Sequence, residues 1–165
     1  MCFAVYIGTD KPLATSQWNE ADRQLYLADL AQKDDPARQH FSKPYVYYAG
    51  SHTQCGCGFF HNSMVFTDDP AMMREYEETQ KSACALAAVL MQALDHADTV
   101  EAFVTWEGRQ GEAPARRLTL VPSALLSPLE PYGPEADREV MMARSSVEEQ
   151  DFIVFRKDGD CRTSA

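Results

Sequence analysis

The sequence predicts an α+β fold in which a mixed or antiparallel sheet is covered by one long amphipathic helix. The helix is indicated by apolar residues that recur at three and four positions over residues 70–95, after the starting signal Asp68-Asp69-Pro70. The sheet is indicated by several short apolar or alternating runs that end at glycine, proline or aspartate. One dominant helix on one sheet is the economical way to bury these elements in a single core.

Four elements are expected before the helix. Residues 2–7 form a continuous apolar run closed by turn residues, which predicts a buried central strand. Residues 25–30 fit either a strand or a short helix. An aspartate followed by proline at the first helical position predicts one or two helical turns over 36–41. Residues 45–49 are rich in tyrosine and valine, which favour β structure, and they predict another strand.

After the helix, residues 100–106 alternate along the chain as a strand does, and 117–121 form a second strand. Because these two runs are neighbours in the sequence, we expect them to form a hairpin. The segment 122–134 contains four prolines and is expected to lack regular structure. The last of these prolines predicts the start of a short helix over 134–143, and residues 151–156 predict the final strand.

A chain of 165 residues, 45% of them apolar, is large enough to bury a core without disulfides or metal. We expect a soluble single globular domain over 1–156 and a polar C-terminal tail over 157–165. The net charge of −10 argues against nonspecific binding to nucleic acid or to an anionic membrane. The N-terminus lacks a secretory signal, and no apolar run is long enough to span a membrane. Because the five cysteines lack a regular framework, we expect reduced thiols and a cytoplasmic location.

The cluster best suited to chemistry follows the strand at 45–49 and contains two thiols and two imidazoles. One glycine separates Cys55 from Cys57, and His52 and His61 flank the pair. On extended backbone the two thiols would point to the same face, and the adjacent glycines would allow a bend that brings the sulfurs closer. Zinc prefers sulfur and imidazole ligands, so the cluster predicts a site for zinc or another transition metal, although its spacing differs from the usual zinc patterns.

Two other interpretations of this cluster stay open. The Cys-Gly-Cys-Gly turn could be purely structural, with small cysteines filling gaps beneath phenylalanines, in a non-catalytic homodimer or adaptor domain. Alternatively, Cys55 and Cys57 could cycle between dithiol and disulfide, because a thiolate near a histidine is the reactive form of cysteine. No dinucleotide-binding, phosphate-loop, nucleophile-elbow or zinc-protease motif occurs in the sequence to favour one reaction.

Cys2 is a further candidate for the site. Removal of Met1 would place a free α-amine beside the Cys2 thiol, which resembles the N-terminal nucleophile hydrolases, including glutamine amidotransferase domains that begin Met-Cys. The resemblance implies a nucleophilic Cys2 in a layered fold, for which this chain is short. We favour a buried strand cysteine at this position. Cys2 would approach Cys55 and Cys57 if the first strand lies next to the strand at 45–49.

Overall fold

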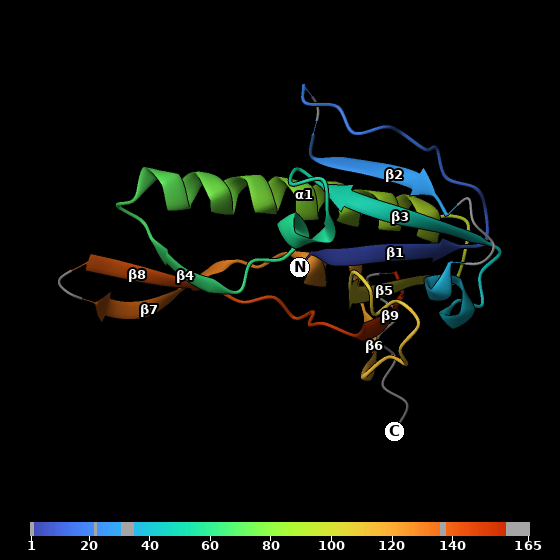
Figure 1. Ribbon diagram of the computed structural model, residues 1–165. Helices are drawn as coiled ribbons and strands as arrows, with labels where there is room; N and C mark the ends of the chain where they lie inside the picture. The colour runs from blue at the N-terminus through green and yellow to red at the C-terminus, as the bar shows by residue number, and fades with distance from the viewer. Residues whose placement is uncertain (1, 22, 31–34, 136–137, 158–165) are drawn as a thin grey trace.

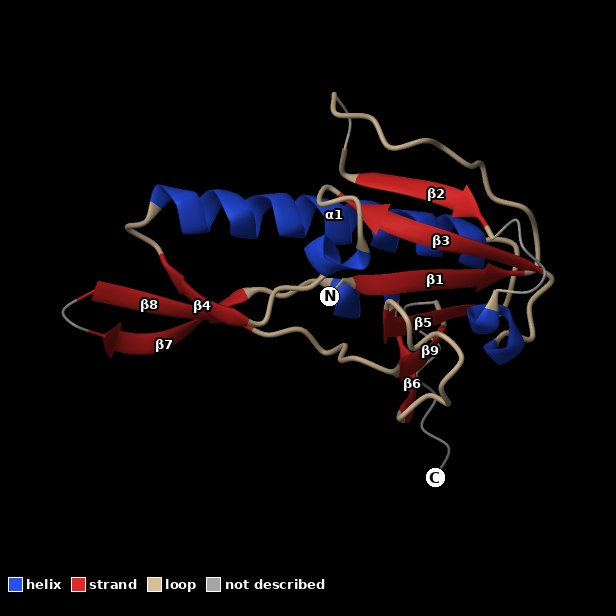
Figure 2. Ribbon diagram, viewed as in Figure 1, coloured by secondary structure: helices blue, strands red, loops and turns tan. Residues whose placement is uncertain are grey.

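The computed structural model describes residues 2–21, 23–30, 35–135 and 138–157. It confirms the α+β class, because one long helix packs against a mixed six-stranded sheet and a three-stranded sheet accompanies it (Figure 2). The strands are β1 (Phe3–Thr9), β2 (Leu25–Asp29), β3 (Tyr45–Ser51), β4 (Ser63–Phe66), β5 (Val100–Trp106), β6 (Arg116–Leu120), β7 (Leu129–Glu135), β8 (Arg138–Ala143) and β9 (Asp151–Phe155). The helices are α1 (Pro70–Leu94) and the short 3-10 helices η1 (Pro36–His40), η2 (Gly56–Phe59) and η3 (Pro122–Leu125).

β1 is an inner strand of the larger sheet, whose strand order is β2-β3-β1-β5-β9-β6. It pairs antiparallel with β3 along one edge and with β5 along the other. The central position predicted for the first strand is therefore confirmed, and its side chains from Ala4 to Thr9 are buried. The choice between strand and helix near residue 25 is also decided, because β2 pairs antiparallel with β3.

The predicted hairpin between the two strands that follow the helix is wrong. β9 lies between β5 and β6, pairing antiparallel with the first and parallel with the second. Burial explains this order, because Phe152, Ile153 and Phe155 of β9 are all buried, whereas no residue of β6 is fully buried. A strand with apolar side chains on both faces belongs inside a sheet, and a more polar strand is suited to its edge.

The predictions for the proline-rich segment and for a short helix over 134–143 are also wrong. β7 and β8 pair antiparallel, with an irregular step between Pro131 and Gly133. β7 is the edge strand in the order β4-β8-β7, and an edge tolerates proline because one side of the strand makes no ladder hydrogen bonds. β8 pairs with strands on both sides, so sheet formation outweighs the helix-starting signal of proline. The pattern did not predict β4.

α1 begins as the sequence predicts. The Asp69 side chain accepts hydrogen bonds from the backbone N–H groups of Ala71 and Met72, at 2.9 and 3.3 Å, and Pro70 occupies the first turn. The buried residues of the helix begin at Thr79 and are Thr79, Ser82, Ala83, Leu86, Ala87, Leu90, Ala93 and Leu94. The first turns extend past the larger sheet, on the same side of the molecule as β4, β7 and β8 (Figure 1). The resemblance of the Met-Cys start to N-terminal nucleophile hydrolases stays a prediction.

The larger sheet is covered on both faces. On one face, Val5 and Ile7 of β1 belong to the same core as Leu86 and Leu90 of α1. On the other face, a second core gathers under η1 and the loop that follows it; its buried members are Ala4, Tyr6, Ala37, Phe41, Val46, Phe103 and Phe152. Because both faces are used, the functional side chains have to lie at the ends or edges of this sheet.

Two further predictions concern the whole chain. No described helix combines the length and apolar character needed to cross a membrane. Of the polar tail predicted over 157–165, only Lys157 belongs to the described residues, and the tail beyond it lies outside them. The single-domain boundary at residue 156 stays a prediction.

The packing of α1 on the sheet can be tested with two neighbouring helix residues. Leu90 is 1% exposed and Met91 is 50% exposed. We expect Leu90→Ala to lower the free energy of unfolding by about 2–5 kcal/mol, because it leaves a cavity against the sheet. We expect Met91→Ala to change it by about 0.5 kcal/mol or less. Chemical denaturation of both variants makes the comparison, and equal losses would contradict this packing.

Candidate metal centre

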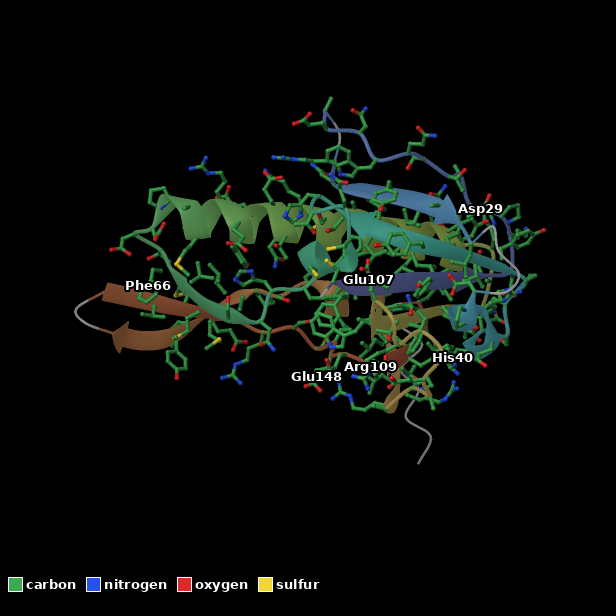
Figure 3. All side chains as sticks on the ribbon, in the orientation of Figure 1. Asp29, His40, Phe66, Glu107, Arg109 and Glu148 are labelled. Atoms are coloured by element: carbon green, nitrogen blue, oxygen red, sulfur yellow. The ribbon has the colours of Figure 1, made fainter. Side chains whose placement is uncertain are left out.

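Three thiols from distant parts of the chain meet near one end of the larger sheet. Cys2 precedes β1, Cys55 follows β3, and Cys57 lies in η2. The three sulfur atoms all lie within 4.8 Å of one another. Sulfur atoms gather there close to Glu107, whose backbone N–H donates a hydrogen bond to the Cys2 carbonyl at 2.9 Å (Figure 3). The pairing of β1 with β3 is what brings Cys2 to the other two thiols, as the sequence allowed.

A tight turn after β3 positions Cys55 and Cys57. The backbone N–H and the hydroxyl of Ser51 both donate to the Cys55 carbonyl, at 2.9 and 2.6 Å. Gln54 has a left-handed backbone, with φ of 67°, and its N–H donates to the Ser51 carbonyl at 2.9 Å. η2 then begins at Gly56. The sulfurs therefore approach through a closed turn and a 3-10 helix, which is a bend at the glycines of the kind that the sequence allowed.

Glycine at position 56 lets this turn lie directly on β1. A Cβ atom built at Gly56 would lie 2.7 Å from Val5 Cγ2 and 3.0 Å from the Phe3 carbonyl oxygen. Real Cβ atoms do not approach neighbours so closely, so any other residue would push the turn away from the strand. The glycine that separates the two cysteines is thus a packing requirement of the site, because it brings both thiols against the start of β1.

Two polar groups contact two of the three sulfurs. The Phe3 backbone N–H donates to Cys57 Sγ at 3.2 Å, and Thr53 Oγ1 lies 3.4 Å from Cys55 Sγ. Sequence reasoning did not identify either group. A backbone amide leaves no signal in the sequence, and Thr53 differs from any other turn threonine only once the turn is closed. Donors aimed at sulfur stabilise the thiolate form, which is the form that binds metals and attacks disulfides.

The three thiols differ in acidity. Burial raises the pKa of Cys55, but the Thr53 hydroxyl, the Cys57 amide and the two neighbouring thiols outweigh it, so the pKa of Cys55 lies below its ordinary value. Burial, with hydrogen bonding to Cys55 and the charge of Cys55 acting in the same direction, raises the pKa of Cys57 to about 11. Hydrogen bonding to Cys55 also raises the pKa of Cys2. Cys55 is therefore the first of the three to become a thiolate.

The structure places the two predicted histidine ligands outside this group of thiols. His52 Nδ1 lies 2.9 Å from the hydroxyl of Ser82, a residue of α1 that is fully buried. His61 Nε2 lies 2.9 Å from the Ser63 hydroxyl, and its ring packs edge-on against Tyr76. Burial lowers the pKa of both histidines, which favours the neutral ring. Their role as metal ligands stays a prediction, and among the described residues the compact group is Cys2, Cys55 and Cys57.

An aromatic pair adjoins the thiols at the start of β1. The rings of Phe3 and Trp106 stack with centroids 4.1 Å apart and an interplanar angle of 20°. The Trp106 indole N–H donates to the Glu149 carboxylate, which ties the pair to the segment before β9. The indole of Trp106 therefore lies close to the start of β1 in space, although it is distant from the three cysteines in the sequence.

Comparisons of the chain with protein-family models, with curated proteins and with solved structures find no match. The chemistry open to the site is set by its own geometry. That geometry consists of three thiols of unequal acidity, held by a turn that packs on an inner strand.

Gly56→Ala tests whether close packing of the turn builds the site. The added methyl would strike Val5 and the Phe3 carbonyl, so we expect the free energy of unfolding to fall by about 1–3 kcal/mol. Gly111→Ala is the control, because its Cβ would come no closer than 3.3 Å, to a proline side chain. Denaturant titration of both variants measures the difference. An unchanged stability for Gly56→Ala would argue against the close contact.

Proposed function

We propose that Cys2, Cys55 and Cys57 bind a transition metal ion of the zinc-like, thiophilic class. The observation that carries this proposal is the approach of three sulfur atoms to within 4.8 Å of one another. The chain is large enough to bury a core without a metal, so the gathering of three thiols is not needed for folding alone. Soft ions such as zinc and copper favour thiolate ligands.

The spacing of the sulfurs supports this proposal. Zinc–sulfur bonds of about 2.3 Å in a tetrahedral arrangement separate two sulfurs by about 3.8 Å. The widest sulfur pair in the cluster is no more than 4.8 Å apart, so it would close by about 1 Å or less. Cys2 is the first residue before β1 and Cys57 lies in a single 3-10 turn, so small side-chain rotations suffice for this change.

The acidities of the thiols also fit metal binding. Thiolates bind metals, so the ion has to displace the protons that Cys2 and Cys57 hold at neutral pH. Cys55 supplies the first thiolate and therefore the first point of attachment. Once bound, the ion would join the start of β1 to the turn after β3 and would stabilise the folded chain by mass action.

A thiol redox role is the second candidate. The low pKa of Cys55 and the two thiols beside it favour this role. A peroxide would oxidise the Cys55 thiolate to a sulfenic acid, and a neighbouring thiol would then form a disulfide with release of water. Three close thiols favour metal binding over this role, because a metal ion can bind all three sulfurs whereas one disulfide uses only two.

The homodimer or adaptor interpretation draws less support from the described surface. Its exposed large apolar side chains are Tyr45, Met91 and Tyr132, which come from β3, α1 and β7. Three separate elements contribute one such residue each, and a protein interface usually needs a contiguous apolar patch. The dimer stays a prediction.

Elemental analysis of protein purified without a histidine tag or chelator tests the proposed metal site. We expect about one thiophilic ion per chain in the native protein and close to none in the Cys55→Ser/Cys57→Ser variant. Cys84→Ser is the matched control, because Cys84 is an exposed thiol on α1 outside the cluster. A metal content that survives in the double variant, or is missing from native protein even after zinc or copper is supplied, would contradict the proposal.

The affinity for metal should rise with pH. Cys2 and Cys57 have raised pKa values, so each loses a proton to the solvent when the ion binds. We expect the logarithm of the affinity to increase by about two to three for each pH unit between about pH 6 and pH 8. Competition with a chelator of known pH dependence measures this slope. A slope near zero would mean that the ion binds without displacing thiol protons and would count against these ligands.

A further inference from the structure

We infer that the site is a three-coordinate, all-sulfur centre that selects Cu(I) over Zn(II), with no histidine among its ligands. This inference rests on the proposed metal binding and specifies the ion and the ligand set. It departs from the mixed sulfur and imidazole site that the sequence predicts.

The first argument is the composition of the ligand group. Among the described residues, the donor atoms that lie within 4.8 Å of one another come from Cys2, Cys55 and Cys57. Neither ring nitrogen of His52 or His61 belongs to that group. Zinc in structural sites is almost always bound by four ligands, so this trio would leave one zinc position to solvent. Thiolates suit both zinc and Cu(I), but Cu(I) does not require a fourth ligand, so a set of three sulfurs favours Cu(I).

The second argument is that His52 already has hydrogen-bonding partners away from the thiols. Its Nδ1 lies 2.9 Å from Ser82 Oγ, and its backbone N–H donates to the same oxygen at 3.3 Å. Ser82 is 0% exposed, so moving His52 toward the thiols would leave a buried hydroxyl without this partner. The ring also lies against Gly58, where an added Cβ would come within 2.6 Å of His52 Cε1. His52 is therefore held between η2 and α1 by groups that a metal would have to displace.

His61 also has partners away from the thiols. Its Nε2 lies 2.9 Å from Ser63 Oγ at the start of β4, and its ring meets Tyr76 of α1 at 5.7 Å between centroids. These contacts draw the side chain toward β4 and α1, whereas the thiols lie at the start of β1. The two histidines thus hold the turn and β4 onto the helix.

The third argument concerns the hydrogen bonds to the sulfurs and the burial of Cys55. The Phe3 N–H donates to Cys57 Sγ and the Thr53 hydroxyl lies beside Cys55 Sγ, so negative charge on sulfur has donors already in place. Cys55 is buried, which protects a bound Cu(I) ion from solvent and oxidants. Copper would enter and remain as Cu(I). Each new copper–sulfur bond replaces a sulfur–hydrogen bond or occupies an existing thiolate, and each displaced proton goes to solvent.

The test is an anaerobic competition titration of metal-free protein with Cu(I) against a Cu(I) chelator, and with Zn(II) against a zinc chelator. The native chain is compared with Cys55→Ser, with His52→Ala/His61→Ala and with Cys84→Ser. We expect one Cu(I) per chain, an affinity lower by about 100-fold or more in Cys55→Ser, and changes of about threefold or less in the other two variants. X-ray absorption of the native copper protein should find about three sulfur neighbours and no nitrogen.

The absorption measurement uses native protein, so it decides the ligand set even if the double histidine variant folds poorly. His61→Ala alone is a milder variant, because its Ser63 contact is exposed. Zinc held by a nitrogen or oxygen as fourth ligand, with an affinity that falls about tenfold in the histidine variants, would overturn the Cu(I) inference and leave the metal-binding proposal standing. Failure of both ions to bind would overturn the inference and the proposed function together.

Discussion

The pairing of β1 on both of its edges is the constraint on which the rest of this structure depends. β3 lies along one edge and β5 along the other, so β1 fixes the register of the inner sheet. Its alternate side chains then enter the two cores: Val5 and Ile7 face α1, while Ala4 and Tyr6 face η1. The same pairing places the residue before β1 beside the turn after β3. The thiol cluster is therefore a consequence of sheet register, and it could not form if β1 were an edge strand elsewhere in the sheet.

The turn from Ser51 to Gly58 converts this proximity into a site. Two hydrogen bonds from Ser51 close the turn on the Cys55 carbonyl, and Gly56 allows it to lie against Phe3 and Val5. Because the thiols lie so close, each affects the pKa of the others. Hydrogen bonds from the protonated Cys2 and Cys57 stabilise a thiolate on Cys55. A metal ion would replace those protons and take over the stabilisation. Metal binding at this site would therefore be coupled to the position of the first strand through the same few contacts.

Local patterns identified individual elements better than their arrangement. The caps and periodicity of α1 and the apolar runs of β1, β3, β5 and β9 were sufficient to predict those elements. The position of β9 between β5 and β6 was not predictable from neighbouring segments, because a strand close to the C-terminus enters the sheet between two strands that follow each other in the chain. The sequence did not predict β7 because its prolines indicate irregular structure, and it did not predict β8 because Pro134 indicates the start of a helix. On an edge strand proline costs little, and β7 is an edge because the sequence-distant β4 pairs with the other side of β8.

The sequence by itself determined the α+β class, the long helix and the cysteines that could serve as ligands, because periodicity, caps and residue chemistry are local properties. It also indicated that Cys2 would matter if two strands were neighbours. Only the tertiary structure decided that they are neighbours, that Cys2 joins Cys55 and Cys57, and that His52 and His61 contact Ser82 and Ser63. The physical reason is that a ligand set depends on which distant segments meet at one end of a sheet, and burial summed over the whole chain decides that.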